Sequence, residues 1–185
     1  MIIKGILFGL LSGGLMAMLL LAAHFIFGYE NTQDLARYEQ AGYLGLILAL
    51  LVIVAGIHFY RIKNWGQRGF VYYLAMGSVI TVTAAAVMGG YTAVYHTLNP
   101  EFTEIYYNSS EQVELIKNDP DLTAGQKKLA LEKLEEQNAV FKSTWLQVVV
   151  MMGQIMIIGL LITFFTSLGF WWVDNRPGKG HVEKI

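Results

Sequence analysis

The sequence contains no cysteine, only three prolines and little charge, and these shortages exclude several classes of protein. Without cysteine the chain has no disulfide, no thiolate nucleophile and no thiolate metal site. Charged residues make up 15% of the 185 residues, whereas hydrophobic residues make up 55%. That balance is too apolar for an ordinary soluble domain, and the chain is too short for several domains. We therefore expect a single membrane domain over residues 1–185.

Four long apolar runs carry most of this hydrophobicity. They cover residues 2–29, 41–60, 70–98 and 145–173. A helix of about 20 apolar residues is long enough to cross the hydrocarbon core of a bilayer. The second run has that minimal length, while the other three exceed it and must tilt or project into the interface. The sequence thus predicts an all-α fold, an integral membrane four-helix bundle.

Basic residues are distributed unevenly between the segments that flank these runs. With the N-terminus inside the cell, Lys4 and the three basic residues of segment 61–68 lie on the cytoplasmic side. The first loop on the opposite side, residues 30–40, has Arg37 as its single basic residue. Short cytoplasmic loops of membrane proteins are enriched in lysine and arginine. We therefore expect a multi-pass protein of the cell inner membrane with both termini in the cytoplasm.

Small residues recur at every fourth position in the first and third runs. They are Gly5, Gly9 and Gly13 in the first run and Gly77, Thr81, Ala85 and Gly89 in the third. Lipid provides no hydrophobic drive for helix association, so small residues that allow close backbone approach take its place. We expect the first and third helices to pack on each other. The alternative is a homo-oligomer that packs through one of these stripes.

The one long polar segment, residues 99–142, has the pattern of an antiparallel helical hairpin between the third and fourth spans. Asn99 and Pro100 have the types expected at the start of a helix, and Thr123 with Gln126 has capping-box spacing. Two seams, each with a single polar residue, pair in mirror order. They consist of Phe102, Tyr106, Ser109, Val113 and Ile116 in the first helix and Leu131, Leu134, Asn138, Phe141 and Trp145 in the second.

This hairpin is expected outside the cytoplasm, with its second helix running without a break into the last span. The segment carries nine carboxylates and five lysines, so its solvated face is acidic. A charged helix face of this kind is usually only solvated, but it can also bind a basic partner.

Polar groups inside the membrane are costly and are the first candidates for function. His24 and His96 are expected near the outer surface and His58 near the inner one, so only the first two could together hold a haem or a metal. Gln154 is expected to make a hydrogen bond between helices. Since no catalytic motif is found, we expect no enzyme, no catalytic residue, no cofactor and no metal.

A set of residues around the short basic loop resembles an uncharacterised family of small four-span bacterial membrane proteins, a domain of unknown function. The set comprises Gly56, Ile57, His58, Phe59, Tyr60, Arg61, Gly66 and Phe70, followed later by Asn99, Pro100, Glu101 and Phe102. The resemblance covers most of the chain. It implies four spans and a bacterial inner membrane, and it implies no activity, cofactor or catalytic residue.

These features favour an accessory or assembly protein that uses its acidic hairpin to bind a membrane or periplasmic protein. A small transporter or channel subunit acting as a homo-oligomer is the first alternative. Haem or metal binding through His24 and His96 is the second. The lipid bilayer is the expected surrounding in every case, and no feature predicts nucleic-acid binding.

Overall fold

A computed structural model describes residues 1–28, 32–63, 69–108 and 111–176. Within these residues the chain forms helices and no strand, which confirms the all-α class. The helices are α1 (Ile2–Phe27), α2 (Thr32–Lys63), α3 (Phe70–Leu98), α4 (Pro100–Asn108), α5 (Glu111–Asn118), α6 (Ala124–Phe141) and α7 (Thr144–Asp174).

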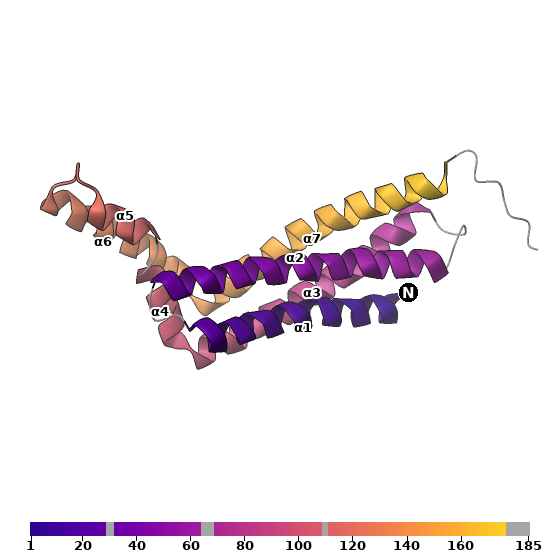
Figure 1. The fold of residues 1–185 in the computed structure, drawn as a ribbon, viewed down its shortest axis with the longest axis horizontal. Coiled ribbons are helices and arrows are strands. Elements are labelled where there is room, and N and C mark those ends of the chain that lie inside the picture. Colours follow the sequence, from indigo (N-terminus) through magenta and orange to yellow (C-terminus); the bar gives the residue numbers. More distant parts are fainter. Residues whose placement is uncertain (29–31, 64–68, 109–110, 177–185) are drawn as a thin grey trace, which may run out of the picture.

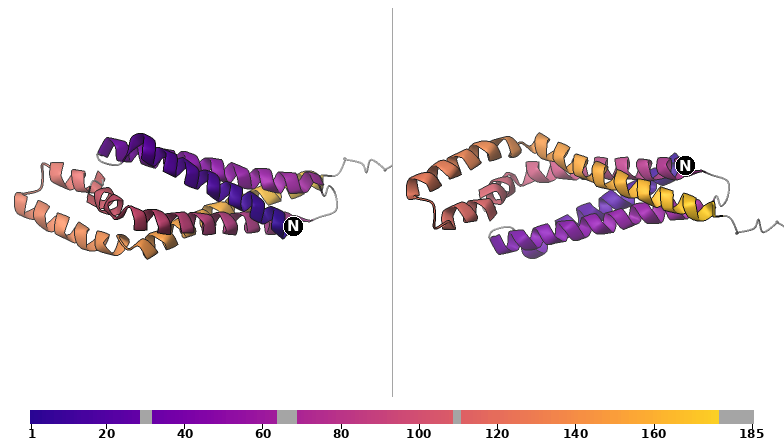
Figure 2. Two further views of the ribbon diagram at one scale, coloured as in Figure 1. Left: turned by 90° about the horizontal axis from the view of Figure 1, so that it is seen from below. Right: turned by 90° about the horizontal axis from the view of Figure 1, so that it is seen from above.

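Four long helices, α1, α2, α3 and α7, run alternately in opposite directions and form one elongated bundle (Figures 1 and 2). Each is long and apolar enough to cross a membrane. Helix α3 packs most extensively on α7 and on α1, and α1 also packs along α2. The short helices α4, α5 and α6 all lie at one end, which we call the hairpin end. The first residues of α1 and the last of α7 lie at the opposite end, the terminal end (Figure 1).

Helix α2 begins earlier than the hydrophobic run predicts. It starts at Thr32 and extends to Lys63, whereas the expected span covers residues 41–60. The added turns carry Leu35 and Tyr38, both of which are buried in the core of the bundle. Most of the expected loop at residues 30–40 is therefore helix, because two apolar side chains in it pack against the other helices.

The glycine stripe of α1 lies directly against α3. A Cβ atom built on Gly13 would be 2.7 Å from the Cβ atom of Val87 and 2.9 Å from the carbonyl oxygen of Ala84. Gly9 and Gly5 meet the same helix one and two turns earlier, respectively. Since real Cβ atoms do not approach carbonyl oxygens or side-chain atoms this closely, only glycine permits the spacing between α1 and α3.

The small residues of α3 face α7 rather than α1. A Cβ atom built on Gly159 of α7 would be 2.6 Å from the Cγ2 atom of Thr81, and one built on Gly77 would be even closer to the Cγ2 atom of Thr163. The hydroxyl oxygens of Thr81 and Thr163 are 3.3 Å apart and share a buried hydrogen bond. Val79, which meets Gly5 of α1, comes two positions after Gly77, which meets α7. Two positions along a helix correspond to about 200° of rotation, so opposite faces of α3 pack on α7 and on α1.

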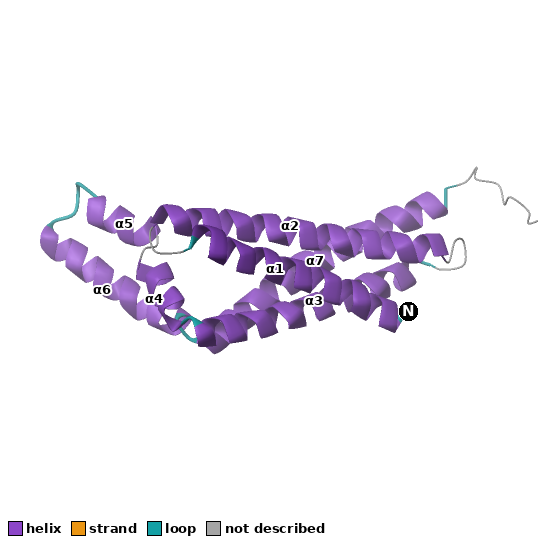
Figure 3. Ribbon diagram, turned by 60° about the horizontal axis from the view of Figure 1, so that its bottom comes forward, coloured by secondary structure: helices purple, strands orange, loops and turns teal. Residues whose placement is uncertain are grey.

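Helices α5 and α6 form an antiparallel pair that extends beyond the bundle (Figure 3). The predicted capping box is confirmed at the start of α6: Thr123 N donates to Gln126 Oε1 at 2.9 Å, and Gln126 N donates to Thr123 Oγ1 at 3.4 Å. The expected continuity of α6 with the last span is wrong. Helix α6 ends at Phe141, and Ser143 has extended backbone angles before α7 begins. The Ser143 carbonyl oxygen accepts the first hydrogen bond of α7 from Gln147 N at 3.1 Å, so a new helix starts there without a glycine or proline.

The two predicted seams meet only in part. Val113 is buried and Ile116 is half-buried in α5, while Leu131, Leu134 and Asn138 are half-buried in α6. The individual residue pairs between the two seams stay predictions. Ser109 lies outside the described residues, as does the side chain of Phe141.

Helix α4 belongs to the bundle and not to the hairpin. The ring of Phe102 is buried, with its centroid 5.3 Å from that of Tyr38 and 5.2 Å from that of Tyr95. Trp145, its expected partner in the hairpin, is 74% exposed. Asn99, before α4, caps the preceding helix, since its Nδ2 atom donates to the Tyr95 carbonyl at 3.0 Å. The first predicted hairpin helix is thus divided between a cap on the bundle and the projecting helix α5.

Candidate functional site

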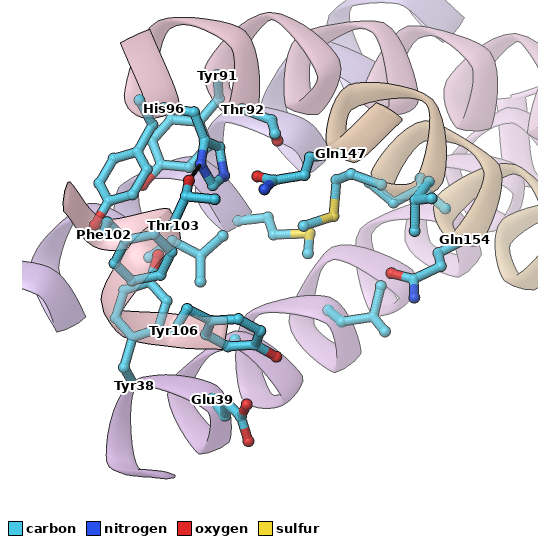
Figure 4. A pocket seen from close by; sticks show the side chains of 18 of the residues that line it. Tyr38, Glu39, Tyr91, Thr92, His96, Phe102, Thr103, Tyr106, Gln147 and Gln154 are labelled. Atoms are coloured by element: carbon cyan, nitrogen blue, oxygen red, sulfur yellow. Dashed lines mark hydrogen bonds between the residues drawn. The ribbon is translucent and has the colours of Figure 1, made fainter. Parts of the chain in front are cut away.

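A cavity of about 310 Å³ lies at the hairpin end of the bundle, between α1, α2, α3, α4 and α7 (Figure 4). Helix α2 lines it with residues 38, 39, 42, 43 and 46, and α7 lines it with residues 147, 150, 151, 154 and 155. Both series have the three- and four-residue spacing of a single helix face. The cavity is therefore built by one continuous face of each of these two helices.

The depth of the cavity follows from its position on α7. Gln154, one of its deepest lining residues on that helix, comes ten residues after Thr144, the first residue of α7. At 1.5 Å of rise per residue this is about 15 Å, or roughly half the thickness of a bilayer's hydrocarbon core. If α7 spans the bilayer, the cavity extends from one membrane surface to near its middle.

Helix α4 closes the cavity at the hairpin end. Its Thr103 hydroxyl lies 2.8 Å from Nδ1 of His96, and Phe102 packs on Tyr38 and Tyr95. Tyr106, one turn after Phe102, also lines the cavity. This cap contacts both α2 and α3, because the chain changes direction after α3 and α4 runs across the end of the bundle (Figure 1).

The two histidines that could have formed a haem or metal site both neighbour Tyr95. His24 Nδ1 lies 2.9 Å from the Tyr95 hydroxyl, while His96 bonds to Thr103 and its ring contacts the Tyr95 ring. Each imidazole thus joins two helices through a hydroxyl group. No cluster of three or more metal-ligating side chains of the histidine, cysteine or carboxylate types occurs in the described part of the chain. His58 lies elsewhere, beside Phe170.

Gln154 lines the cavity, and its expected hydrogen bond between helices is not formed. Its side chain is directed into the cavity in Figure 4, is exposed, and makes no hydrogen bond to any residue in the described ranges. The reason is that α7 presents this face to the cavity rather than to α3, which it contacts through Thr163 and Gly159.

An ion pair that sequence reasoning missed joins α2 to α7 at the terminal end. Arg61 Nε donates to both carboxylate oxygens of Asp174, at 2.9 and 3.0 Å, and the Tyr73 hydroxyl donates to Asp174 at 2.9 Å. The guanidinium also lies 5.0 Å from the centroid of the Phe170 ring. Arg61 is only 8% exposed. The available signal was Asp174 itself, a lone carboxylate at the end of an uncharged apolar run.

Helices α2 and α7 are therefore joined at one end and separated by the cavity at the other. Figure 2 shows them crossing near the terminal end and separating toward the hairpin end. At the rim of the cavity, Tyr43 of α2 is 68% exposed and Val150 of α7 is 42% exposed. The cavity is thus open sideways between these two helices, on a face that membrane lipid would cover.

Four apolar helices of membrane length, packed through glycine and threonine and enclosing a cavity at one end, define a multi-pass integral membrane protein. A family model described as "Protein of unknown function (DUF4199)" matches residues 7–170, and the chain belongs to this family. This confirms the resemblance noted from the sequence. No curated protein and no solved structure matches the chain.

Proposed function

We propose that the protein is an accessory or assembly protein of a bacterial inner membrane that binds a partner protein through α5 and α6. The observation that supports this role is that α5 and α6 make few contacts with the bundle. In the described part of the chain, α5 packs on α6, and α6 meets the bundle mainly where it joins α7. A helical pair that contributes little to the packing of the spans is available for another protein.

The surface of α5 and α6 suits a partner protein that has basic residues around an apolar contact area. Glu135 and Glu136 are exposed on α6, and Leu115 and Leu129 are 63% and 54% exposed on α5 and α6. Large exposed apolar side chains supply contact area, while complementary charge directs the encounter and the choice of partner.

A photo-crosslinking amino acid placed at Leu115 or Leu129 is expected to give discrete protein adducts in native membranes. The double substitution Glu135→Lys and Glu136→Lys should reduce those adducts at least several-fold, because it removes the charge complementarity. Leu51, which is 56% exposed on α2, is the matched lipid-facing control and should give no such adduct. The charge control is Glu104→Lys on α4, outside the pair. Adducts that survive the α6 reversal unchanged would contradict the proposed surface.

Removing the pair is a second arm of the same test. Replacing residues 111–141 by a short flexible linker should leave a folded protein that no longer recovers the crosslinked partner. The excision must begin after α4, because Phe102 of α4 is buried against the bundle. Recovery of the same partner without α5 and α6 would exclude this role for them.

We infer that the hairpin end faces away from the cytoplasm. Lys4, Arg61 and Arg176 all belong to the terminal end, and cytoplasmic flanks are the basic ones. Because the chain has no cysteine, single cysteines can report the orientation directly. Gly125→Cys in the exposed first turn of α6 should react with a membrane-impermeant maleimide in spheroplasts. Arg176→Cys should react only after the membrane is opened, and the reverse pattern would overturn the orientation.

A further inference from the structure

We propose that the cavity at the hairpin end binds an amphipathic cation, a molecule with one amine or quaternary ammonium head and an apolar tail. This site is separate from the α5–α6 surface and does not depend on its role.

The charge of the cavity favours a positive head group. Glu39 lines the cavity and makes no ion pair with a described residue. No lysine or arginine is among the described residues that line it. A cleft with one unbalanced carboxylate and apolar walls concentrates cations and repels anions. Phosphate and carboxylate ligands are therefore disfavoured here.

Aromatic rings accompany this carboxylate. Tyr43 lines the cavity one turn after Glu39 on α2. Tyr106 of α4 lies on the same side of the cavity as Glu39 (Figure 4). A ring face attracts an ammonium group through its quadrupole, and aromatic side chains are the usual means of recognising quaternary ammonium. A carboxylate beside tyrosine rings combines charge with this attraction at one position.

The deeper part of the cavity suits an apolar tail. Met16 of α1, Leu46 of α2, and Met151 and Ile155 of α7 line it. Methionine side chains are flexible and adapt to tails of different shape. The volume of about 310 Å³ is at the lower end of the range for small-molecule sites, roughly 300 to 1,000 Å³.

The lateral opening between α2 and α7 gives such a ligand a route from the bilayer into the cavity. An amphipathic cation partitions into the bilayer with its head at the interface and its tail in the hydrocarbon. The cavity has the same arrangement, because Glu39 is near the start of α2 while Ile155 lies near the middle of α7. The ligand can therefore enter between α2 and α7 without leaving the membrane or reversing its orientation.

The test measures binding of dodecyltrimethylammonium to the full-length protein in nanodiscs by titration calorimetry, with empty nanodiscs subtracted. Dodecylphosphocholine and dodecyl maltoside share the tail and differ in the head, so they separate a zwitterionic lipid-like head and a neutral head from a cation. We expect the cation to bind about tenfold more tightly than either. Equal affinity for all three would mean that only the tail is bound, and would overturn the proposal.

Two substitutions, each with a matched control, locate the site. Glu39→Gln keeps the shape of an exposed side chain and should lower the affinity for the cation about tenfold, with no change for the maltoside. Glu104→Gln, at an exposed position outside the cavity, should change neither. Gly42→Phe should fill the cavity and abolish binding, whereas Gly153→Phe, where nothing lies within 4 Å of a Cβ atom, should not. Unchanged cation affinity in Glu39→Gln would exclude the site, whatever the folding of the Gly42 variant.

Discussion

Replacing Gly13 by leucine is expected to force α1 away from α3 and to lower the free energy of unfolding by about 3 kcal/mol. A Cβ atom at this position would lie 2.7 Å from the Val87 Cβ atom and 2.9 Å from the Ala84 carbonyl oxygen. Neither atom can move aside, because one is fixed to the backbone and the other belongs to it. The strain can be relieved only by separating the two helices, which also removes the contacts at Gly5 and Gly9.

The neighbouring residue provides a matched control for this substitution. Gly14 is in the same turn of α1, and nothing lies within 4 Å of a Cβ atom built there. Gly14→Leu therefore makes the same change in composition and helix propensity without a clash, and should change stability by less than about 0.5 kcal/mol. Both variants can be compared by reversible unfolding in mixed micelles, followed by tryptophan fluorescence. Equal stability of the two would show that α1 does not pack on α3 as described.

Replacing Asp174 by alanine is expected to lower the free energy of unfolding by about 3 kcal/mol, because it leaves Arg61 buried without its counter-ion. The same change removes the acceptor of the Tyr73 hydroxyl. We place the effect at the lower end of the range for buried ion pairs, since Arg61 is near the end of its helix and can extend its guanidinium toward the interface.

Removing both partners separates an unpaired charge from a lost contact. Arg61→Met with Asp174→Leu should recover most of the stability that Asp174→Ala loses, because no buried charge remains. A double-mutant cycle of Arg61→Met, Asp174→Leu and the double variant, in the same unfolding assay, measures the coupling between the two residues. Asp121→Ala, at an exposed turn position, is the control for loss of a carboxylate. If the double variant were as unstable as Asp174→Ala, the ion pair would not be what joins α2 to α7.

Helix packing could be predicted from the sequence only in part. The stripe at Gly13 has a period of four that marks a close contact in any membrane helix. The stripe at Thr81 has the same period, so the pattern alone does not tell which neighbour each one faces. Position 79 faces α1 and position 77 faces α7, although both belong to the same uniformly apolar run. Which face of α3 packs on which helix depends on where α7 lies, and no local sequence pattern specifies that position.

The candidate site was less predictable than the fold. Gln154 could be recognised as a polar residue in a span, but not as part of a cavity, because its partners come from four other helices. Glu39 was assigned to a loop, since the apolar run begins only at Ala41. Arg61 was counted as a loop charge, and its pairing with Asp174 crosses more than a hundred residues of sequence.

By itself the sequence determined that the chain is all-helical, that four of its helices suit a membrane, and where α6 begins. These properties depend on local composition and on side chains a few residues apart, which act before any tertiary contact forms. Only the tertiary structure decided that α2 starts at Thr32, that α4 caps the bundle, that α6 and α7 are separate, and that a cavity opens between α2 and α7. Each of those outcomes depends on which helix faces pack together. Residues distant in the chain decide this packing, because their side chains set how closely two backbones can approach.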